Sequence, residues 1–234
     1  MRILRSVYNK AVGEGIASQR APFEKVYTGV DKTRKRAVDM ATIESLRKLD
    51  LRGSRSLAYA RDLFVFSFYM RGMAFVDMAY LRKSDVRDQT AQYIRRKTGQ
   101  SLCIRLEPCI TEIIRRYARK TKNSPYVFPI IAATDENEAY AQYQNALSYY
   151  NKLLKKLSKL LQADTPLSSY VSRHTWATTA RNCDIPLSVI SAGLGHRSQA
   201  TTQIYLASLE DSVIDEANRK IIFSLNRPGK TSSL

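Results

Sequence analysis

Apolar residues recur at helical spacing between positions 137 and 161, and this stripe constrains what the chain can fold into. Tyr150, Leu154 and Leu157 fall on one face of the expected helix, whereas most neighbouring lysines fall on other faces. Other elements of the fold must cover a stripe of this kind. The spacing therefore predicts a long helix with one buried side and a basic exterior.

Similar spacing predicts helices through most of the chain. The other helices expected on this basis cover residues 3–16, 42–50, 54–70, 108–120 and 208–225. Three further short helices, separated by tight turns, are expected in the last third. Ser168 or Ser169 can cap the first of these, and Pro186 can begin the second, which Gly193 and Gly195 break.

Three short segments with strand character interrupt the helical pattern. They cover residues 85–86, 91–95 and 101–106. In the last of them Leu102, Ile104 and Leu106 occupy alternate positions, as a half-buried strand requires. Gly99 supports a hairpin with Lys97 at its tip. The predicted fold is therefore mainly α-helical with a small antiparallel β-sheet, an α+β arrangement.

The charge balance indicates a polyanionic partner. The 234 residues include 38 Lys and Arg against 21 Asp and Glu, which gives a net charge of +17. Such an excess favours nucleic acid or an anionic membrane surface. No apolar run approaches the roughly 20 residues that cross a bilayer, so membrane insertion is excluded.

The N-terminus and the cysteines both suggest a cytoplasmic protein. The opening sequence MRILRSVYNKAVGEG lacks the apolar core and small-residue cleavage site of a secretory signal. Cys103, Cys109 and Cys183 are odd in number and show no metal-ligand spacing, which fits free thiols in a reducing compartment. We expect them to pack as small hydrophobic side chains.

A change in composition predicts a domain boundary early in the chain. Pro22, Gly29 and the basic cluster 32–36 follow the first expected helix and are typical of a linker. We therefore expect residues 1–30 to be the end of a preceding domain and residues 31–234 to form a second domain.

Several residues carry the groups that cleavage of a DNA backbone requires. Such chemistry needs cations around one phosphate, a nucleophile, and an acid for the leaving oxygen. Arg173 and His196 lie in or beside the short helices, and Tyr205 follows shortly after His196. Lys97 at the hairpin tip and Arg71 at the end of a helix can complete a basic pocket that faces Tyr205.

Three segments resemble motifs of the phage integrase, or tyrosine recombinase, family. LGHRSQATTQIYLAS is similar to the motif in which a His in a Leu-Gly-His turn precedes a Thr-Thr pair and the nucleophilic Tyr. SSYVSRHTWATTA resembles the segment with the second catalytic Arg, and RRKTGQSLCIRL resembles the hairpin with the catalytic Lys. The resemblance covers roughly residues 33 to 225 and is closest to integrases of mobile elements in Bacteroides-type bacteria.

The resemblance implies a tyrosine recombinase catalytic domain that cleaves and rejoins DNA at specific sites through a 3′-phosphotyrosine. Tyr205 would attack the scissile phosphate, Arg173 would grip its non-bridging oxygens, and His196 would donate a hydrogen bond to it. Lys97 would protonate the leaving 5′-oxygen, a role that needs a removable proton. The intermediate stores the phosphoester energy, so no ATP, metal or other cofactor is required.

Two positions depart from the family pattern. Tyr170 stands where members have the His of His-x-x-Arg; a phenol with a pKa of about 10 is a poor base, although it can hydrogen-bond the phosphate or the nucleophile. Ala74 stands where members have the first catalytic Arg, while Asp77 matches the acidic residue that follows. Arg71 lies about one helical turn earlier, and we expect its side chain to replace the missing Arg.

The resemblance also implies double-stranded DNA as the partner. Residues 1–30 would be the end of a core-binding domain and residues 31–234 the catalytic domain. A chain that is monomeric in solution would assemble as a tetramer on paired DNA sites through its C-terminal helix. The candidates for DNA contacts are Arg34, Lys35, Arg36, Arg95, Arg96 and His174.

Two other functions fit part of this pattern. A type IB topoisomerase shares the nucleophile chemistry but relaxes supercoils without paired sites. A helical DNA-binding protein without catalytic activity would also explain the net charge of +17 and the short helices near the C-terminus.

Overall fold

The chain forms two compact units in the computed structural model. The structure describes the backbone of residues 1–27, 37–196 and 198–206, and the side chains in these ranges except those of residues 2 and 204–206. One unit spans Met1–Lys35 and the other Arg36–Leu234. Within the described ranges, no helix is long and apolar enough to cross a membrane.

The first unit is built on helix α1 (Arg2–Gly13). The Tyr8 hydroxyl donates to the carbonyl of Ser18 at 2.8 Å and accepts from the amide of Arg20 at 2.7 Å. The Tyr8 ring also meets the Phe23 ring edge-on, with centroids 5.9 Å apart. These contacts hold the segment after α1 against the helix.

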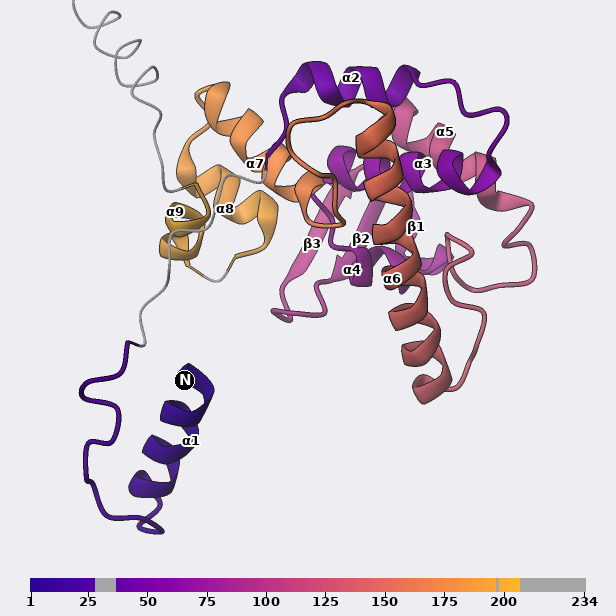
Figure 1. Ribbon diagram of the computed structural model, residues 1–234. Helices are drawn as coiled ribbons and strands as arrows, with labels where there is room; N and C mark the ends of the chain where they lie inside the picture. Colours follow the sequence, from indigo (N-terminus) through magenta and orange to yellow (C-terminus); the bar gives the residue numbers. More distant parts are fainter. Residues whose placement is uncertain (28–36, 197, 207–234) are drawn as a thin grey trace, which may run out of the picture. The chain divides into compact units, whose positions relative to one another are not determined.

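The second unit is mainly helical and contains one small sheet (Figure 1). Its first half contains α2 (Met40–Lys48), α3 (Arg55–Tyr69), α4 (Phe75–Ala79), the 3-10 helix η1 (Lys83–Asp85), β1 (Val86–Arg87), β2 (Thr90–Ile94) and β3 (Ser101–Arg105). Its second half contains α5 (Pro108–Ala118), α6 (Glu136–Leu160), α7 (Val171–Asn182), α8 (Leu187–Leu194) and α9 (Gln199–Leu206). The strands form an antiparallel sheet in the order β1-β2-β3, so the predicted fold class is confirmed.

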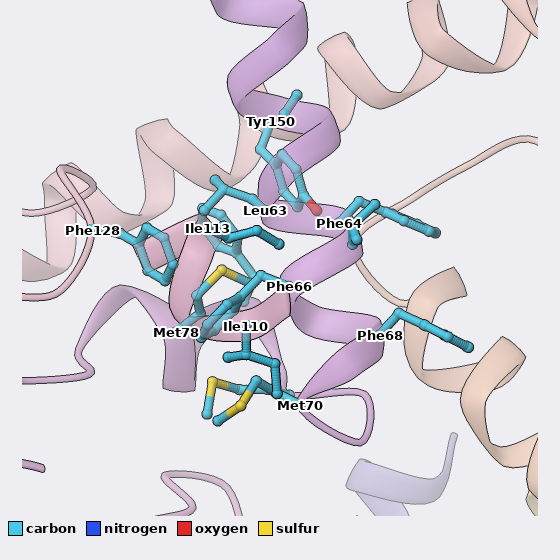
Figure 2. Packing of buried hydrophobic residues seen from close by; sticks show 14 of the residues in the cluster. Leu63, Phe64, Phe66, Phe68, Met70, Met78, Ile110, Ile113, Phe128 and Tyr150 are labelled. Carbon is cyan, nitrogen blue, oxygen red and sulfur yellow. The ribbon is translucent and has the colours of Figure 1, made fainter. Parts of the chain in front are cut away.

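Helix α3 lies at the centre of the hydrophobic core. It contacts α2, α5, α6 and α7. Its Leu63, Phe64 and Phe66 are buried together with Phe128 and Tyr150 from other segments (Figure 2). Because large apolar side chains contribute most to burial, this cluster makes α3 a rigid support for the segments at its C-terminal end.

Helix α6 packs against α3 with the face that the sequence predicted. Tyr150, Leu154 and Leu157 are buried, whereas Lys155 and Lys159 are exposed. The expected long helix with one buried side and a basic exterior is therefore confirmed.

The β2–β3 hairpin carries Lys97 in its turn, as expected. The amide of Arg95 donates to the carbonyl of Gln100, and the amide of Gly99 donates to the carbonyl of Arg95, both at 2.8 Å. Gly99 has a φ of +68°, a conformation that glycine adopts without a steric cost. Lys97 is exposed on this turn.

Two expectations about helix ends are wrong. No side chain caps α7, so neither Ser168 nor Ser169 has that role. Gly193 lies inside α8, and only Gly195 ends this helix, in the left-handed conformation with φ +64°. A Cβ at Gly193 would lie 2.8 Å from the Trp176 ring, so this glycine allows α7 and α8 to pack closely.

The expectation that the cysteines pack in the interior is also wrong. Cys103, Cys109 and Cys183 are all exposed. In β3 the alternation that buries Leu102 and Ile104 turns Cys103 outward. Helix α4 was not expected, because a helix of five residues has too little periodicity to detect.

Some expectations lie outside the described residues. They include the helix over 208–225 and the basic residues Arg34, Lys35 and Arg36.

Candidate active site

Arg173 lies in the first turn of α7 and is held by backbone carbonyl groups. The residue is only 3% exposed. Its Nη1 donates to the carbonyl oxygen of Gly72 at 2.9 Å, and its Nη2 donates to the carbonyl oxygen of Leu194. Because a guanidinium does not lose its proton in proteins, these contacts fix a permanent positive charge at this point.

The Gly72 carbonyl belongs to a turn whose backbone conformation is uncommon. Arg71 and Gly72 have φ values of +56° and +70°. The carbonyl of Ser67 near the end of α3 accepts hydrogen bonds from the amides of Gly72 and Met73, at 2.8 and 3.2 Å. A Cβ at Gly72 would lie 2.6 Å from the Cα atom of Arg173, so glycine is required for this close approach.

His196 follows the left-handed Gly195 that ends α8. Its amide donates to the Ser191 carbonyl at 3.0 Å. Its Nε2 lies 3.2 Å from Nη2 of Arg173, and its Nδ1 lies 2.7 Å from Oγ1 of Thr202. The imidazole therefore connects Arg173 in α7 with Thr202 in α9.

The surroundings of His196 favour its neutral form. Burial, followed by the positive charges of Arg173, Arg95 and Lys97, lowers the pKa of this imidazole from 6.5 to about 4. At neutral pH the ring is therefore uncharged. The charge of Lys97 contributes to this shift, although the residue is exposed.

Arg95 connects the hairpin to the turn that carries His196. Its Nη1 donates to the carbonyl oxygen of Gly195 at 2.8 Å, and Oγ1 of Thr98 lies 3.4 Å from the same oxygen. Arg95 is only 3% exposed. Its guanidinium therefore joins two segments of the site, and its contact with DNA stays a prediction.

Arg96 holds the other side of the hairpin to the segment around α4. Its guanidinium lies 3.8 Å from the centroid of the Tyr80 ring, and its amide donates to Oδ1 of Asp77 at 2.9 Å. Burial raises the pKa of the Asp77 carboxyl, while the Arg96 amide and the charges of Arg95 and Arg173 act in the opposite direction. Asp77 is thus the acidic group that faces this cluster of cations.

Arg71 is not one helical turn from Ala74, contrary to the expectation. Helix α3 ends before Arg71, whose backbone is left-handed, and Ala74 is extended. The charge of Arg71 nevertheless acts on this part of the structure. Burial raises the pKa of Tyr93, whereas the charges of Arg173, Arg95 and Arg71 lower it.

A comparison with known families shows which family the chain belongs to. The sequence pattern of the phage integrase family matches residues 38–211. The chain belongs to the phage integrase family. This integrase is a site-specific tyrosine recombinase, an enzyme that transfers DNA strands. The family match does not favour a topoisomerase or a DNA-binding protein without catalytic activity.

Solved structures of recombinases share the integrase's fold. XerA recombinase is 18% identical over 94% of this chain and 73% of its own, with a TM-score of 0.56. The lambda integrase (75–356) dimer bound to a COC′ core site is 15% identical over 88% and 72%, with a TM-score of 0.63. The Tn1549 transposon integrase in complex with circular intermediate DNA is 15% identical over 93% and 76%, with a TM-score of 0.61. A comparison with curated proteins gives no significant match.

The structure of the integrase brings together most of the residues that its sequence singled out. Arg173 and His196 are in contact; Arg71 lies in the turn whose Gly72 binds Arg173, and Lys97 lies in the hairpin whose Arg95 binds the Gly195 carbonyl. Tyr205 belongs to α9, about one helical turn after Thr202. Its side chain lies outside the described part of the structure, as do Arg34, Lys35 and Arg36.

Tyr170 and His174 lie together at the start of α7. Their ring centroids are 5.9 Å apart, and both residues are partly buried. Tyr170 immediately precedes the helix, three positions before Arg173. Among the described residues, no group of His, Cys, Asp and Glu side chains could hold a metal ion.

Sequence reasoning did not identify Gly72 or Thr202 as parts of the site. A glycine just after a helix is a common sign of a turn, but its approach to Arg173 depends on packing. Thr202 belongs to the Thr-Thr pair of the family motif, so the motif contained the signal without showing what the hydroxyl contacts.

Proposed function

We propose that this integrase cleaves DNA by attack of the Tyr205 hydroxyl on a phosphate bound beside Arg173, His196 and Lys97. The observation that carries the proposal is the 3.2 Å contact between Arg173 and His196, close to the charge of Lys97. A permanent cation, an imidazole and an ammonium that meet at one place supply complementary groups for a phosphate that gains negative charge during the reaction.

The covalent step exchanges one phosphoester for another. The Tyr205 oxygen forms a bond to phosphorus and releases its proton to water, while the bond from phosphorus to the 5′-oxygen breaks. Lys97 gives a proton to this departing oxygen. Attack by the 5′-hydroxyl of another strand then reverses these steps and rejoins the DNA.

Arg173 and His196 stabilise the charge that develops on the phosphate. The carbonyls of Gly72 and Leu194 hold Arg173 in place before DNA arrives, so little reorganisation is needed during the reaction. The negative charge of the phosphate favours protonation of His196, which then donates a hydrogen bond to a phosphate oxygen.

Arg71 takes the role of the missing first Arg, and Tyr170 hydrogen-bonds the phosphate or the nucleophile. Arg71 directly precedes Gly72, whose carbonyl accepts from Arg173, and this place beside Arg173 supports the first assignment. The place of Tyr170 at the start of α7 supports the second.

Double-stranded DNA contacts further basic residues outside this site. The net charge of +17 supports broad contact with the DNA backbone. Residues 1–30 are the end of a core-binding domain, and residues 31–234 form the catalytic domain. The residues that touch DNA directly are Arg34, Lys35, Arg36, Arg95, Arg96 and His174.

A suicide substrate with a nick beside the cleavage site tests the nucleophile. After attack, the short fragment that carries the free 5′-hydroxyl diffuses away. The covalent protein-DNA adduct therefore accumulates, and it survives boiling in detergent. We expect the adduct with the wild type and with the control Tyr149→Phe, whose tyrosine is 56% exposed on α6. Its absence in Tyr205→Phe supports the proposal, and an adduct in that variant refutes it.

A substrate with sulfur in place of the bridging 5′-oxygen tests Lys97. A thiolate is a much better leaving group than an alkoxide and needs no proton from the enzyme. Lys97→Met should therefore cleave the ordinary substrate poorly but the sulfur substrate at nearly the wild-type rate. An equal loss of cleavage rate on both substrates would show that Lys97 is not the general acid.

The monomeric integrase assembles as a tetramer on paired sites, with residues 210–225 docked on a neighbouring chain. Truncation at Ser208 should then reduce recombination far more than binding to a single site. Equal losses in both assays would instead indicate that the C-terminal segment packs within its own chain.

Supercoil relaxation without a sequence requirement would support the topoisomerase alternative.

A further inference from the structure

Thr202 is fully buried in α9 and its hydroxyl contacts the ring of His196. The residue has 0% exposure, and its Oγ1 lies 2.7 Å from Nδ1. On the other side of the ring, Nε2 lies 3.2 Å from Nη2 of Arg173. Side chains from α7, the α8–α9 turn and α9 thus form a continuous chain of polar contacts.

The donors and acceptors in this chain determine which nitrogen of His196 carries the proton. A guanidinium can only donate, so Nε2 must accept from Arg173. The neutral ring therefore carries its proton on Nδ1, which donates to the hydroxyl of Thr202. The next proton that the ring takes up goes to Nε2, on the side of Arg173.

We infer that Thr202 is a positioning residue: its hydroxyl accepts the Nδ1 proton of the tautomer that Arg173 imposes on His196, and so stabilises this tautomer and ties α9 to Arg173. Tyr205 belongs to the same helix, so this contact also holds the segment that carries the proposed nucleophile. The inference rests on the proposed function, in which Arg173 and His196 act on the same phosphate.

The Thr202 contact lets His196 change from acceptor to donor without turning its ring. When a phosphate binds beside Arg173, the imidazole takes up a proton at Nε2 and can donate it to the phosphate. The Nδ1–H donates to the Thr202 hydroxyl throughout, so the ring keeps its orientation. Without the hydroxyl, a buried Nδ1–H loses its acceptor and the other tautomer becomes competitive.

The tautomer of His196 can be measured in the ¹⁵N-labelled protein without DNA. The chain contains two histidines, so a His174→Gln variant assigns the ring signals. At neutral pH, two-bond ¹H–¹⁵N correlations should show the wild-type ring protonated at Nδ1, and Thr202→Val should weaken this preference, because only the contact with Arg173 then favours it. A wild-type ring protonated mainly at Nε2 overturns the inference, whether or not any variant folds.

Cleavage of the nicked substrate provides the second readout. We expect Thr202→Val to slow adduct formation by roughly tenfold to a hundredfold, the range known for groups that orient metal-bound imidazoles, with DNA affinity nearly unchanged. Thr202→Ser, which restores the hydroxyl, should recover most of the rate. Thr201→Val is the matched control, because Thr201 is exposed on the same helix.

The two readouts separate this inference from the proposed function. Equal tautomer ratios and cleavage rates in Thr202→Val and Thr201→Val overturn the role of Thr202. If the wild type forms no adduct, the proposed function fails, while the tautomer measurement still decides whether Thr202 orients His196.

Discussion

The carbonyl oxygen of Gly72 accepts a 2.9 Å hydrogen bond from Nη1 of Arg173, and a Cβ at Gly72 would lie 2.6 Å from the Cα atom of Arg173. The turn after α3 and the first turn of α7 therefore meet with no space for even a methyl group. The position of Arg173 depends on a residue 101 positions away that has no functional group of its own.

Gly72→Ala should disturb both the fold and the site. We expect the free energy of unfolding to fall by about 2–4 kcal/mol, because a φ of +70° is unfavourable for alanine and its Cβ overlaps Arg173. Cleavage per folded molecule should fall as well, since Arg173 is displaced. Chemical denaturation and the nicked-substrate assay measure the two effects.

Gly53→Ala is the matched control for this change, because nothing lies within 4 Å of a Cβ at Gly53. It should cleave DNA like the wild type. A Gly72→Ala protein with wild-type stability and cleavage would show that the turn can move away from α7 without consequence.

Arg71→Gly separates the charge of Arg71 from its strained backbone. Glycine accepts the φ of +56°, so the free energy of unfolding should stay within about 1 kcal/mol of the wild type. Cleavage should be lost, as in Arg71→Ala, while DNA affinity changes only a few fold, because one phosphate contact among many contributes little to binding. Normal cleavage by both variants would show that another cation acts as the first Arg.

The free energy of unfolding should decrease between pH 6.5 and pH 4 through His196. Burial and nearby cations lower the pKa of this ring to about 4 in the folded chain, whereas it is about 6.5 in the unfolded chain. Between these values the unfolded chain binds more protons, so acidification favours unfolding. Urea denaturation across this range should show the stability difference between the wild type and His196→Gln shrinking as the pH falls. A constant difference would mean that the folded structure does not hinder protonation of His196.

Asp62 joins α3 to α5 at a distance from the proposed site. Its carboxylate accepts from the Tyr117 hydroxyl at 2.8 Å and lies 3.0 Å from Nε of Arg61 and 3.3 Å from Nη1 of Arg116. Asp62→Ala should cost about 2–3 kcal/mol of unfolding free energy, because it leaves a buried hydroxyl and a largely buried cation without their acceptor.

Cleavage per folded molecule should be unchanged in Asp62→Ala. Asp50→Ala provides the comparison, because Asp50 forms an exposed ion pair with Arg52 and its removal should hardly change stability. If the two variants are equally stable, the Asp62 contacts do not hold the helices together.

Local sequence patterns were sufficient for most elements of the fold, although not for the short helix α4. The spacing of Tyr150, Leu154 and Leu157 predicted α6, and the turn around Gly99 predicted the hairpin that carries Lys97. These predictions succeed because helical periodicity and turn chemistry depend on residues that are neighbours in the chain.

The same reasoning failed where local rules did not apply. Arg71 was expected on a helix but has a left-handed backbone, which the Ser67 carbonyl and the packing of Gly72 against Arg173 impose. The hydrogen bond from Arg95 to the Gly195 carbonyl was not expected, because the two residues are 100 positions apart in the chain.

By itself, the sequence determined most of the helices and strands, which family motifs they carry, and that the partner is a polyanion. Only the tertiary structure decided that Arg173 is held by Gly72, that Arg95 is buried, and that Thr202 reaches His196. The physical reason is that these contacts join residues from different elements, so they exist only once α3, α7, α8 and the hairpin have packed together.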